Sequence, residues 1–405
     1  MYSRKPCFDS YLPLQSPRMK FSCKTSDLLG GIQLVSRAIG TEQVLPILQN
    51  ILIQVEGKRC TLSATNLELS IVTSFEVTIE NEGSITVPAK AILNFMQYNQ
   101  DDQVVLETSE GTQLKLHSKR AKAVISGEPA NGFPNIAGIQ KETTLTLPIS
   151  PLLRALHLVT FACAKTTSRP VISGVFVRLE KGKLIFVGTD SYRLSEYRVQ
   201  VEGLTGDISC IIPARFLEEL KGVIALHRGR DEEKPKEKDK EKKEKTEETL
   251  EINLGSQQVE VHIGHTRLIS RLIDGKFPDY VQVLPKEKNT VATVFSKDLL
   301  NAVKRMHYFA KEQSNNITFA FNKDGVHLTT RQTQLGKDES TINADLDGKE
   351  NKIAISSTYI IDFLARLDTE KVAVELSDKM HPAVFRIPGD ESYLHLIMPL
   401  RMNEE

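Results

Sequence analysis

The 405-residue chain has few cysteines, no long apolar run and no excess of either charge. Its cysteines are scattered, odd in number and never paired as CxxC, which argues against a disulfide framework or a zinc site and favours a reducing cytoplasm. No apolar stretch reaches the roughly 18 residues of a membrane-spanning helix. Lys plus Arg equals Asp plus Glu, at 52 each, so net charge neither requires nor excludes a nucleic-acid partner. The cysteines are Cys7, Cys23, Cys60, Cys163 and Cys210.

Catalytic motifs are also scarce. The sequence has no GxxxxGK[ST] phosphate loop, and no Ser/His/Asp set can be assembled. Residues 262–265 spell HIGH, an ATP-binding tetrapeptide of nucleotidyl-transferring synthetases, but they follow the alternating strand residues 259–261 and lack a KMSKS partner. Neighbouring metal ligands are not evident. We therefore expect no enzyme activity, no cofactor and no metal site; ATPase activity in the purified protein would revive the enzyme alternative.

Residues 1–18 contain Pro and Ser but neither hydrophobic periodicity nor the apolar core of a secretory signal. Strand character begins at Met19. We expect residues 1–18 to be a disordered extension and Met19 to be the natural initiator, which N-terminal sequencing of the native protein would test.

Apolar residues at helical spacing recur three times, each time after a serine that we expect to cap the helix. The serines and apolar positions are Ser26 with Leu28, Ile32, Val35 and Ile39; Ser150 with Leu152, Leu156, Val159 and Cys163; and Ser296 with Leu299, Val303 and Met306. Each helix precedes alternating strands and then a second helix. The second helices are predicted from Ile92, Leu93 and Met96; from Phe216, Leu217 and Leu220; and from Ile360, Ile361 and Leu364.

The spacing of these copies indicates a repeat of whole domains. Leu28 and Leu152 are 124 positions apart, as are Thr65 and Thr189. Longer later spacings are explained by a charged insert at residues 230–249, which cannot bury apolar surface. It is a solvated loop, a frayed helix or an electrostatic tether. We expect an extension at 1–18, domains at 19–143, 144–289 and 290–405, and an α+β fold in which two helices per domain pack on antiparallel sheet.

The stretch 184–194 (LIFVGTDSYRL) is the clearest candidate for a functional surface. An apolar strand leads to Gly188, which we expect to loosen it, and then to a polar turn. Tyr192, Arg193 and Leu194 follow without a nucleophile and base. This combination predicts a surface that binds a partner rather than one that reacts with it.

The three-copy layout and four motifs, which occur in order and at the expected spacing, together resemble the bacterial sliding clamps, the β subunits of DNA polymerase III. The motifs are RPVISGV at 169–175, GTDSYRL at 188–194, GKFPDYVQVLP at 275–285 and LIMPLR at 396–401. The resemblance covers about residues 19–403. It implies a head-to-tail homodimer whose six domains close into a ring around double-stranded DNA, without sequence preference. A clamp loader would place the ring.

The resemblance also implies that cations on the helices face DNA and attract its phosphates. Few aromatic residues accompany these cations, which argues against a site where single-stranded DNA stacks. Individually, such cations could equally be solvated surface residues. The candidates are Arg37, Lys90, Arg154, Lys165, Arg169, Arg215, Lys304 and Arg305. Glu42 departs from the basic residue that the family often has before Leu45.

A peptide-binding pocket between the second and third domains is implied for the polymerase III α subunit, the loader and other partners. Apolar residues would line the slot and arginines would serve its rim. Ile172, Val283 and Ile397 could instead be core residues. Gln282 replaces an Arg of some clamps, and the chain continues past Arg401. The implied set is Ile172, Thr189, Ser191, Tyr192, Arg193, Leu194, Pro278, Gln282, Val283, Tyr359, Met380, Pro382, Ile397, Met398, Pro399, Leu400 and Arg401.

For ring closure, the edge strand from Lys122 to Ile125 is expected to pair with the third domain of the other chain, with Tyr308 and Phe309 as apolar partners of Ile125. Burial of Tyr308 and Phe309 within the third domain is the alternative. A protein-binding scaffold with no DNA role remains a second functional possibility, which salt-sensitive retention on circular DNA would argue against.

Overall fold

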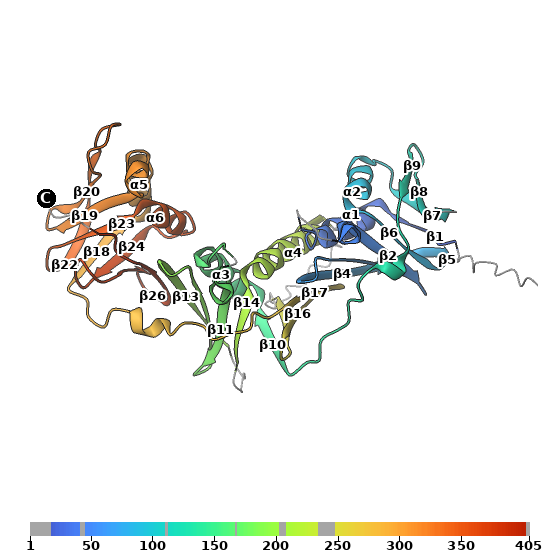
Figure 1. The fold of residues 1–405 in the computed structure, drawn as a ribbon, viewed down its shortest axis with the longest axis horizontal. Helices are drawn as coiled ribbons and strands as arrows, with labels where there is room; N and C mark the ends of the chain where they lie inside the picture. The colour runs from blue at the N-terminus through green and yellow to red at the C-terminus, as the bar shows by residue number, and fades with distance from the viewer. Residues whose placement is uncertain are drawn as a thin grey trace, which may run out of the picture. The chain divides into compact units, whose positions relative to one another are not determined.

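The computed structural model describes residues 18–40, 45–109, 112–166, 168–201, 208–233 and 248–401 (Figure 1). The chain forms two compact units: residues 1–138 with 262–269, and residues 139–261 with 270–405. Unit 1 contains the first repeat. Unit 2 contains the second repeat, apart from residues 262–269, and the third repeat. The predicted extension at 1–18, apart from Arg18, lies outside the described residues, as do Cys7, Glu42, most of the charged insert and residues 402–405.

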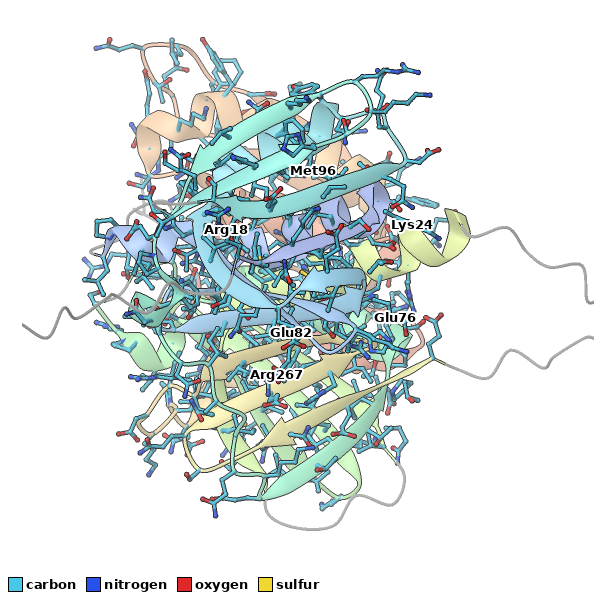
Figure 2. The ribbon with its side chains drawn as sticks, turned by 90° about the vertical axis from the view of Figure 1, so that its right-hand side faces the viewer. Arg18, Lys24, Glu76, Glu82, Met96 and Arg267 are labelled. Atoms are coloured by element: carbon cyan, nitrogen blue, oxygen red, sulfur yellow. The ribbon has the colours of Figure 1, made fainter. Side chains whose placement is uncertain are left out.

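Unit 1 holds two helices against antiparallel sheet. Its five-stranded sheet has the order β5-β1-β7-β8-β9, and β4, β3, β2 and β6 pair in that order. Met96 of α2, labelled in Figure 2, is fully buried. The elements are β1(Lys20–Lys24), α1(Thr25–Ser36), η1(Pro46–Gln49), β2(Asn50–Glu56), β3(Arg59–Thr65), β4(Leu69–Glu76), β5(Thr78–Asn81), β6(Gly83–Pro88), α2(Ala89–Tyr98), β7(Gln103–Ser109), β8(Gln113–His117), β9(Lys122–Ser126) and η2(Ala130–Gly132).

In the second repeat, helices α3 and α4 accompany strands β10 to β17. Strand β10 pairs with β15, and β14, β11, β12 and β13 pair in that order. The elements are β10(Thr143–Pro148), α3(Ile149–Val159), η3(Thr160–Ala162), η4(Pro170–Ile172), β11(Gly174–Glu180), β12(Lys183–Thr189), β13(Arg193–Gln200), β14(Ser209–Pro213), α4(Ala214–Glu233), β15(Thr249–Leu254), β16(Gln258–Ile263), β17(Thr266–Arg271) and η5(Tyr280–Val283).

The third repeat has helices α5 and α6. Its strand β26 pairs with β13, so the two repeats share a nine-stranded sheet of order β14-β11-β12-β13-β26-β25-β24-β18-β22, beside a four-stranded sheet β21-β20-β19-β23. The elements are β18(Thr290–Phe295), α5(Ser296–Ala310), η6(Lys311–Gln313), β19(Asn316–Asn322), β20(Gly325–Thr329), β21(Glu339–Ile342), β22(Ala344–Gly348), β23(Asn351–Ser356), α6(Ser357–Leu364), β24(Lys371–Leu376), β25(Ala383–Ile387) and β26(Asp390–Ile397).

The six helices occur where the apolar spacing predicts them, but the predicted serine caps are wrong. Each first helix follows a strand directly, and its preceding residue makes no side-chain cap hydrogen bond. The first helical N–H instead donates to a main-chain carbonyl from the other half of the repeat. The pairs are Thr25 to Asp102, Ile149 to Glu248 and Ser296 to Glu370, at 2.9, 2.8 and 2.8 Å. Main-chain carbonyls thus satisfy donors that helix starts leave unpaired.

The same turn recurs in the first two repeats. Thr65 Oγ1 donates to the carbonyl of Leu69, and Thr189 Oγ1 donates to the carbonyl of Arg193. Leu67 and Ser191 occupy the same place with positive φ angles of 75° and 80°. Where the first repeat has Leu69, the second has Arg193. This difference gives the second turn a charged side chain on a fixed backbone.

Gly188 does not loosen its strand, contrary to the sequence-based expectation. It continues β12 and pairs with Ser195. A Cβ atom at Gly188 would lie 2.6 Å from the Val159 carbonyl oxygen and 2.9 Å from Cys163 Sγ. Glycine is therefore required because the end of α3 packs directly on this strand.

Gly188→Ala should lower the free energy of unfolding by about 1–3 kcal/mol, the usual effect of overpacking. Gly229→Ala is the matched control. A Cβ atom at Gly229, within α4, has no neighbour within 4 Å, so alanine should stabilise by about 0.5–1 kcal/mol. Urea unfolding of both variants measures the contrast, and equal effects would contradict the close packing at Gly188.

Candidate functional site

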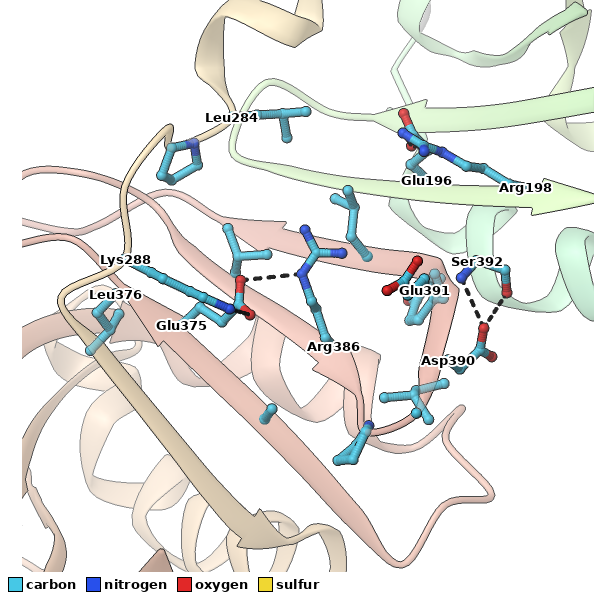
Figure 3. A pocket seen from close by; sticks show the side chains of 18 of the residues that line it. Glu196, Arg198, Leu284, Lys288, Glu375, Leu376, Arg386, Asp390, Glu391 and Ser392 are labelled. Carbon is cyan, nitrogen blue, oxygen red and sulfur yellow. Dashed lines mark hydrogen bonds and ion pairs between the residues drawn. The ribbon is translucent and has the colours of Figure 1, made fainter. Parts of the chain in front are cut away.

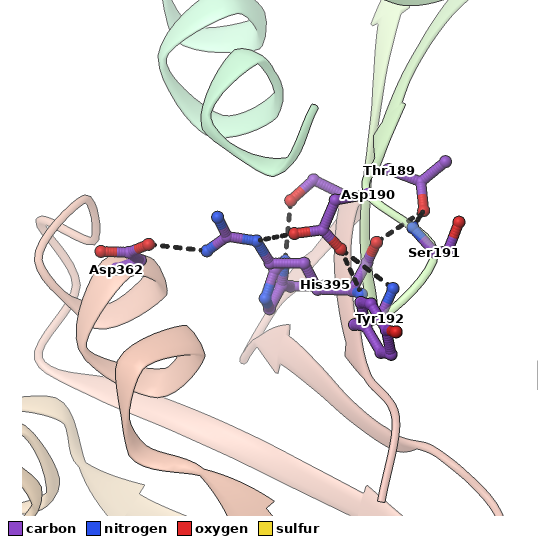
Figure 4. Close-up of polar contacts among 8 residues, drawn as sticks. Thr189, Asp190, Ser191, Tyr192, Asp362 and His395 are labelled. Atoms are coloured by element: carbon purple, nitrogen blue, oxygen red, sulfur yellow. Dashed lines mark hydrogen bonds and ion pairs between the residues drawn. The ribbon is translucent and has the colours of Figure 1, made fainter. Parts of the chain in front are cut away.

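The turn between β12 and β13, whose residues Thr189 to Tyr192 are labelled in Figure 4, exposes one of two adjacent side chains and buries the other. Asp190 Oδ1 accepts hydrogen bonds from the N–H groups of Tyr192 and Arg193, at 2.9 and 3.0 Å. Ser191 donates its N–H to Thr189 Oγ1 at 3.1 Å. The result is that Tyr192 is 61% exposed and Arg193 only 5% exposed.

Arg193 is fastened to both repeats. Its Nε lies 3.0 Å from Asp190 Oδ2, and its Nη1 lies 2.8 Å from Asp362 Oδ2 on α6. The guanidinium also lies 5.4 Å from the ring centre of Phe161 and 4.7 Å from that of Tyr359. Arg193 is therefore buried and paired within the protein rather than exposed at the rim, and its part in peptide binding stays a prediction.

Beside Arg193, a buried histidine joins β26 to β13. His395 Nδ1 and Ser195 Oγ are 2.7 Å apart, and the imidazole stacks on Phe363 with ring centres 4.5 Å apart. Burial, and then the cations Arg193 and Arg366, hold the pKa of His395 well below its usual value. A neutral imidazole is thus part of the junction between the two repeats.

Apolar residues from several segments meet beside this turn. Ile172 and Leu194 belong to one buried cluster, and Met398 packs against it. Met398 donates its N–H to the Tyr192 carbonyl at 2.8 Å, which fixes the end of β26 against the turn. Sequence-distant parts of the predicted peptide site are therefore adjacent.

The predicted peptide-site residues divide by exposure into a floor and a rim. Ile172 and Ile397 are core residues, whereas Val283 is 43% exposed. Asp378 Oδ1 accepts the N–H groups of Met380 and His381, and Met380 is 75% exposed. Buried members are Ile172, Thr189, Arg193, Leu194, Pro382 and Ile397; half-buried members are Tyr359, Met398, Pro399 and Leu400; exposed members are Ser191, Tyr192, Pro278, Gln282, Val283, Met380 and Arg401.

The last predicted residues are held by the other sheet of the third repeat. Leu400 donates its N–H to the Ala354 carbonyl at 2.8 Å, and the Arg401 carbonyl accepts from Asn316 at 3.4 Å. Gln282 donates to Asp279 at 2.8 Å. Sequence reasoning missed Asp362, although it lies three residues after Tyr359 on a predicted helix, a spacing that places both on one face.

The predicted DNA-binding cations differ in availability. Arg305 makes a two-atom contact with Asp338, at 2.9 and 3.0 Å, and Arg154 pairs with Asp390 at 3.2 Å. Arg169 Nη1 lies 3.3 Å from Ser191 Oγ, beside the turn just described. Arg37 is half-buried. Exposed side chains at the remaining positions are Lys90, Lys165, Arg215 and Lys304.

Strand β9 forms one edge of the five-stranded sheet, as predicted. Ile125 is only 8% exposed, so little of its side chain is available to a partner, and its contact with the other chain stays a prediction. Val124 is 58% exposed and is the apolar side chain that β9 presents. In the third repeat Tyr308 is 61% exposed and Phe309 is half-buried, so Tyr308 is not a core residue.

Several alternatives find no support among the described residues. Residues 262–265 are the end of β16 and the two-residue turn that leads into β17, not a helix start. The part of the chain that the structure describes has no cluster of three metal-ligating side chains and no helix long and apolar enough to cross a membrane. Burial raises the pKa of Cys23, Cys163 and Cys210 to about 12, so these thiols stay protonated.

A cleft of about 710 Å³ lies beside β24, β25 and β26 (Figure 3). No predicted peptide-site residue lines it. Its charges largely satisfy each other: Glu375 pairs with Lys288 at 3.0 Å and with Arg386 at 3.2 Å, and Asp390 accepts from Ser392 at 2.9 Å. The size of this cleft alone therefore does not make it the functional site.

Comparisons with known proteins agree with this architecture. Models of the N-terminal, central and C-terminal domains of the DNA polymerase III beta subunit match residues 19–137, 146–229 and 281–401. The beta sliding clamps of Synechocystis and Haemophilus influenzae are each 27% identical, over 95% of this chain and 100% of theirs.

Solved structures show the same relationship. The DNA polymerase III beta subunit of Thermotoga maritima superimposes with a TM-score of 0.85 at 25% identity, over 95% of this chain and 100% of its own. The sliding clamp of Bacillus subtilis has the same fold, with a TM-score of 0.86 at 24% identity and the same coverage. The chain therefore belongs to the family of bacterial DNA polymerase III beta subunits, the DNA sliding clamps.

Proposed function

We propose that this protein encircles double-stranded DNA as a homodimeric ring and tethers the replicative polymerase to it. The carrying observation is that all three domains of the family are present in order, each with two helices packed on sheet. The family acts as a processivity factor and performs no chemistry. A separate loader would place the ring on chromosomal DNA, in the cytoplasm.

The proposed ring closes through the β9 edge. Within unit 1, β9 pairs with β8 on one side and with no other described strand of that unit on the other. An unpaired edge favours addition of another strand. Val124 on this edge and Tyr308 in the third repeat are exposed apolar side chains that a head-to-tail dimer would bury.

Light scattering and DNA retention together test the ring. We expect a particle of twice the 45.3 kDa chain mass at micromolar concentration. Once loaded, it should remain on nicked circular DNA and leave when that DNA is linearised. Val124→Glu should shift the mass toward the monomer, with Glu68→Gln, on an exposed turn, as a control. A stable wild-type monomer would contradict the ring.

We propose that the surface around Tyr192 binds a short peptide from the polymerase III α subunit and from other partners. Tyr192, Val283 and Met380 supply exposed apolar contacts, and Leu194 and Met398 lie at or near the buried floor. Flexible Met side chains suit a site with several partners. Because Arg193 is internally paired, exposed Arg169 and Arg401 are the arginines available to acidic groups of the peptide.

Tyr192→Ala should weaken peptide binding by about tenfold or more, as expected for an aromatic residue at the centre of an interface. Its exposure means that stability should change by less than about 0.5 kcal/mol. Fluorescence anisotropy with a labelled peptide from the C-terminus of the cognate polymerase III α subunit measures the affinity. Tyr98→Ala, an exposed tyrosine of unit 1, is the matched control. Unchanged affinity in Tyr192→Ala would overturn the site.

A further inference from the structure

A buried polar relay fastens the segment that joins the second and third repeats to strands β11 and β13. Tyr280, the first residue of η5, is 6% exposed, and its hydroxyl donates to Glu196 Oε2 at 2.5 Å. Arg178 Nη2 donates to the same hydroxyl oxygen at 3.1 Å. The hydroxyl is thus both donor and acceptor, which fixes its position in two directions.

The relay contains a carboxylate that is expensive to bury. Glu196 is 2% exposed, and Arg198 Nη2 lies 2.7 Å from its other oxygen. A buried charge is tolerated when it is paired and fully hydrogen-bonded. Burial, and then Glu196, raise the pKa of Tyr280, so the hydroxyl keeps the proton that it donates.

Aromatic packing fixes the ring of Tyr280 independently of its hydroxyl. The ring meets Phe277 edge-on with centres 6.5 Å apart, and Phe277 stacks on Phe176 of β11 at 4.9 Å. The ring therefore contributes apolar packing, and the hydroxyl fixes the position of η5 relative to β11 and β13. A Tyr→Phe change separates these two contributions.

The relay lies directly behind part of the proposed peptide site. Tyr280 is buried, but the next three residues of η5 are exposed, and Val281 and Val283 are 54% and 43% exposed. Gln282 and Val283 belong to the predicted peptide-binding set. Leu284, which follows η5, packs against the cluster that contains Ile172 and Leu194. The position of Tyr280 therefore sets the position of this rim.

We propose that Tyr280, through its hydrogen bond to Glu196, is a positioning residue for the partner-peptide site. It contacts no peptide itself. It holds η5 so that Gln282 and Val283 stand at the correct place before the peptide arrives, which lowers the ordering cost of binding. This inference rests on the proposed peptide-binding function and adds residues outside the predicted set to it.

Tyr280→Phe should weaken binding of the labelled α-subunit peptide by about five- to tenfold, with faster hydrogen exchange across residues 281–284. Glu196→Gln keeps one oxygen acceptor for Tyr280 but turns its NH2 toward the Arg198 guanidinium, so its affinity should fall between wild type and Glu196→Ala, which should match Tyr280→Phe. The double variant Tyr280→Phe with Glu196→Ala should lose no more than either change alone, because both remove one interaction. Tyr98→Phe is the control for loss of an exposed hydroxyl.

The outcomes separate the two proposals. If Tyr192→Ala weakens binding but Tyr280→Phe and Glu196→Ala do not, the positioning inference is overturned and the peptide site stands. If Tyr192→Ala also leaves affinity unchanged, the site itself is wrong. Additive losses in the double variant would likewise overturn the inference, because they would show that Tyr280 and Glu196 act independently.

Discussion

Arg193→Ala should lower the thermal unfolding midpoint of unit 2 by roughly 6–12 °C. Removing one partner of a buried ion pair costs about 3 kcal/mol at the lower end of its range, and each kcal/mol lowers the midpoint by about 2–4 °C in a domain of 150–250 residues. The lower end applies because Asp362 is 39% exposed and Asp190 keeps two N–H donors. Phe161 and Tyr359 also lose their cation contact.

Differential scanning calorimetry with hydrogen exchange measures this effect. Exchange should accelerate in the 189–193 turn and in α6, which the guanidinium joins. The unfolding midpoint of Arg193→Lys should lie between those of wild type and Arg193→Ala. A lysine ammonium keeps the charge, but it lacks the planar guanidinium that reaches two carboxylates and stacks on aromatic rings. Arg169→Ala is the matched control, since Arg169 is exposed nearby and makes a single contact to Ser191. A normal midpoint in Arg193→Ala would mean that the buried pairs do not hold the repeats together.

Acidification should destabilise unit 2 through His395, at up to about 1.4 kcal/mol per pH unit below pH 6.5. The pKa of His395 is lowered in the folded state. Below pH 6.5 the unfolded chain therefore binds a proton at this histidine that the folded protein does not bind. Stability from this group is therefore fully present above the unfolded pKa, near 6.5, and declines as the pH falls below it.

Urea unfolding midpoints between pH 7.5 and 5.0 measure this dependence. His395→Gln should be less stable at neutral pH, because it loses stacking on Phe363, but its stability should fall less steeply with acid. His327→Gln provides the control, since His327 is on the surface beside Asp324. Parallel pH profiles for wild type and His395→Gln would show that His395 is not the group that titrates.

The fold was predictable from spacing because apolar periodicity is local information. Residues such as Leu28, Leu152 and Leu299 are buried at one repeated place in each first helix. The helix starts were not predictable, because their carbonyl partners come from the other half of each repeat. A serine near a helix start looks like a cap in sequence whether or not its hydroxyl is used.

The sequence predicts which segments form the site, but it does not predict which of their side chains are exposed to a partner and which are buried. The adjacent residues Tyr192 and Arg193 suggest one polar, aromatic surface, yet the turn separates them into exposed and buried positions. The burial of Arg193 depends on Asp362, far away in sequence. Similarly, nothing near Tyr280 in the sequence shows that its hydroxyl meets Glu196. Long-range partners, rather than residue types, decide these roles.

The main-chain contacts at the helix starts have a consequence for the order of folding. The N–H groups of Thr25, Ile149 and Ser296 each donate to a carbonyl in the second half of the same repeat. During synthesis that carbonyl leaves the ribosome only after the first half of the repeat. The first turn of α1, α3 or α5 therefore cannot be completed while only the first half has emerged. Because closing such long loops is slow, we expect each repeat to become stable in one late step during synthesis, with its first helix fraying at the N-terminal end until then.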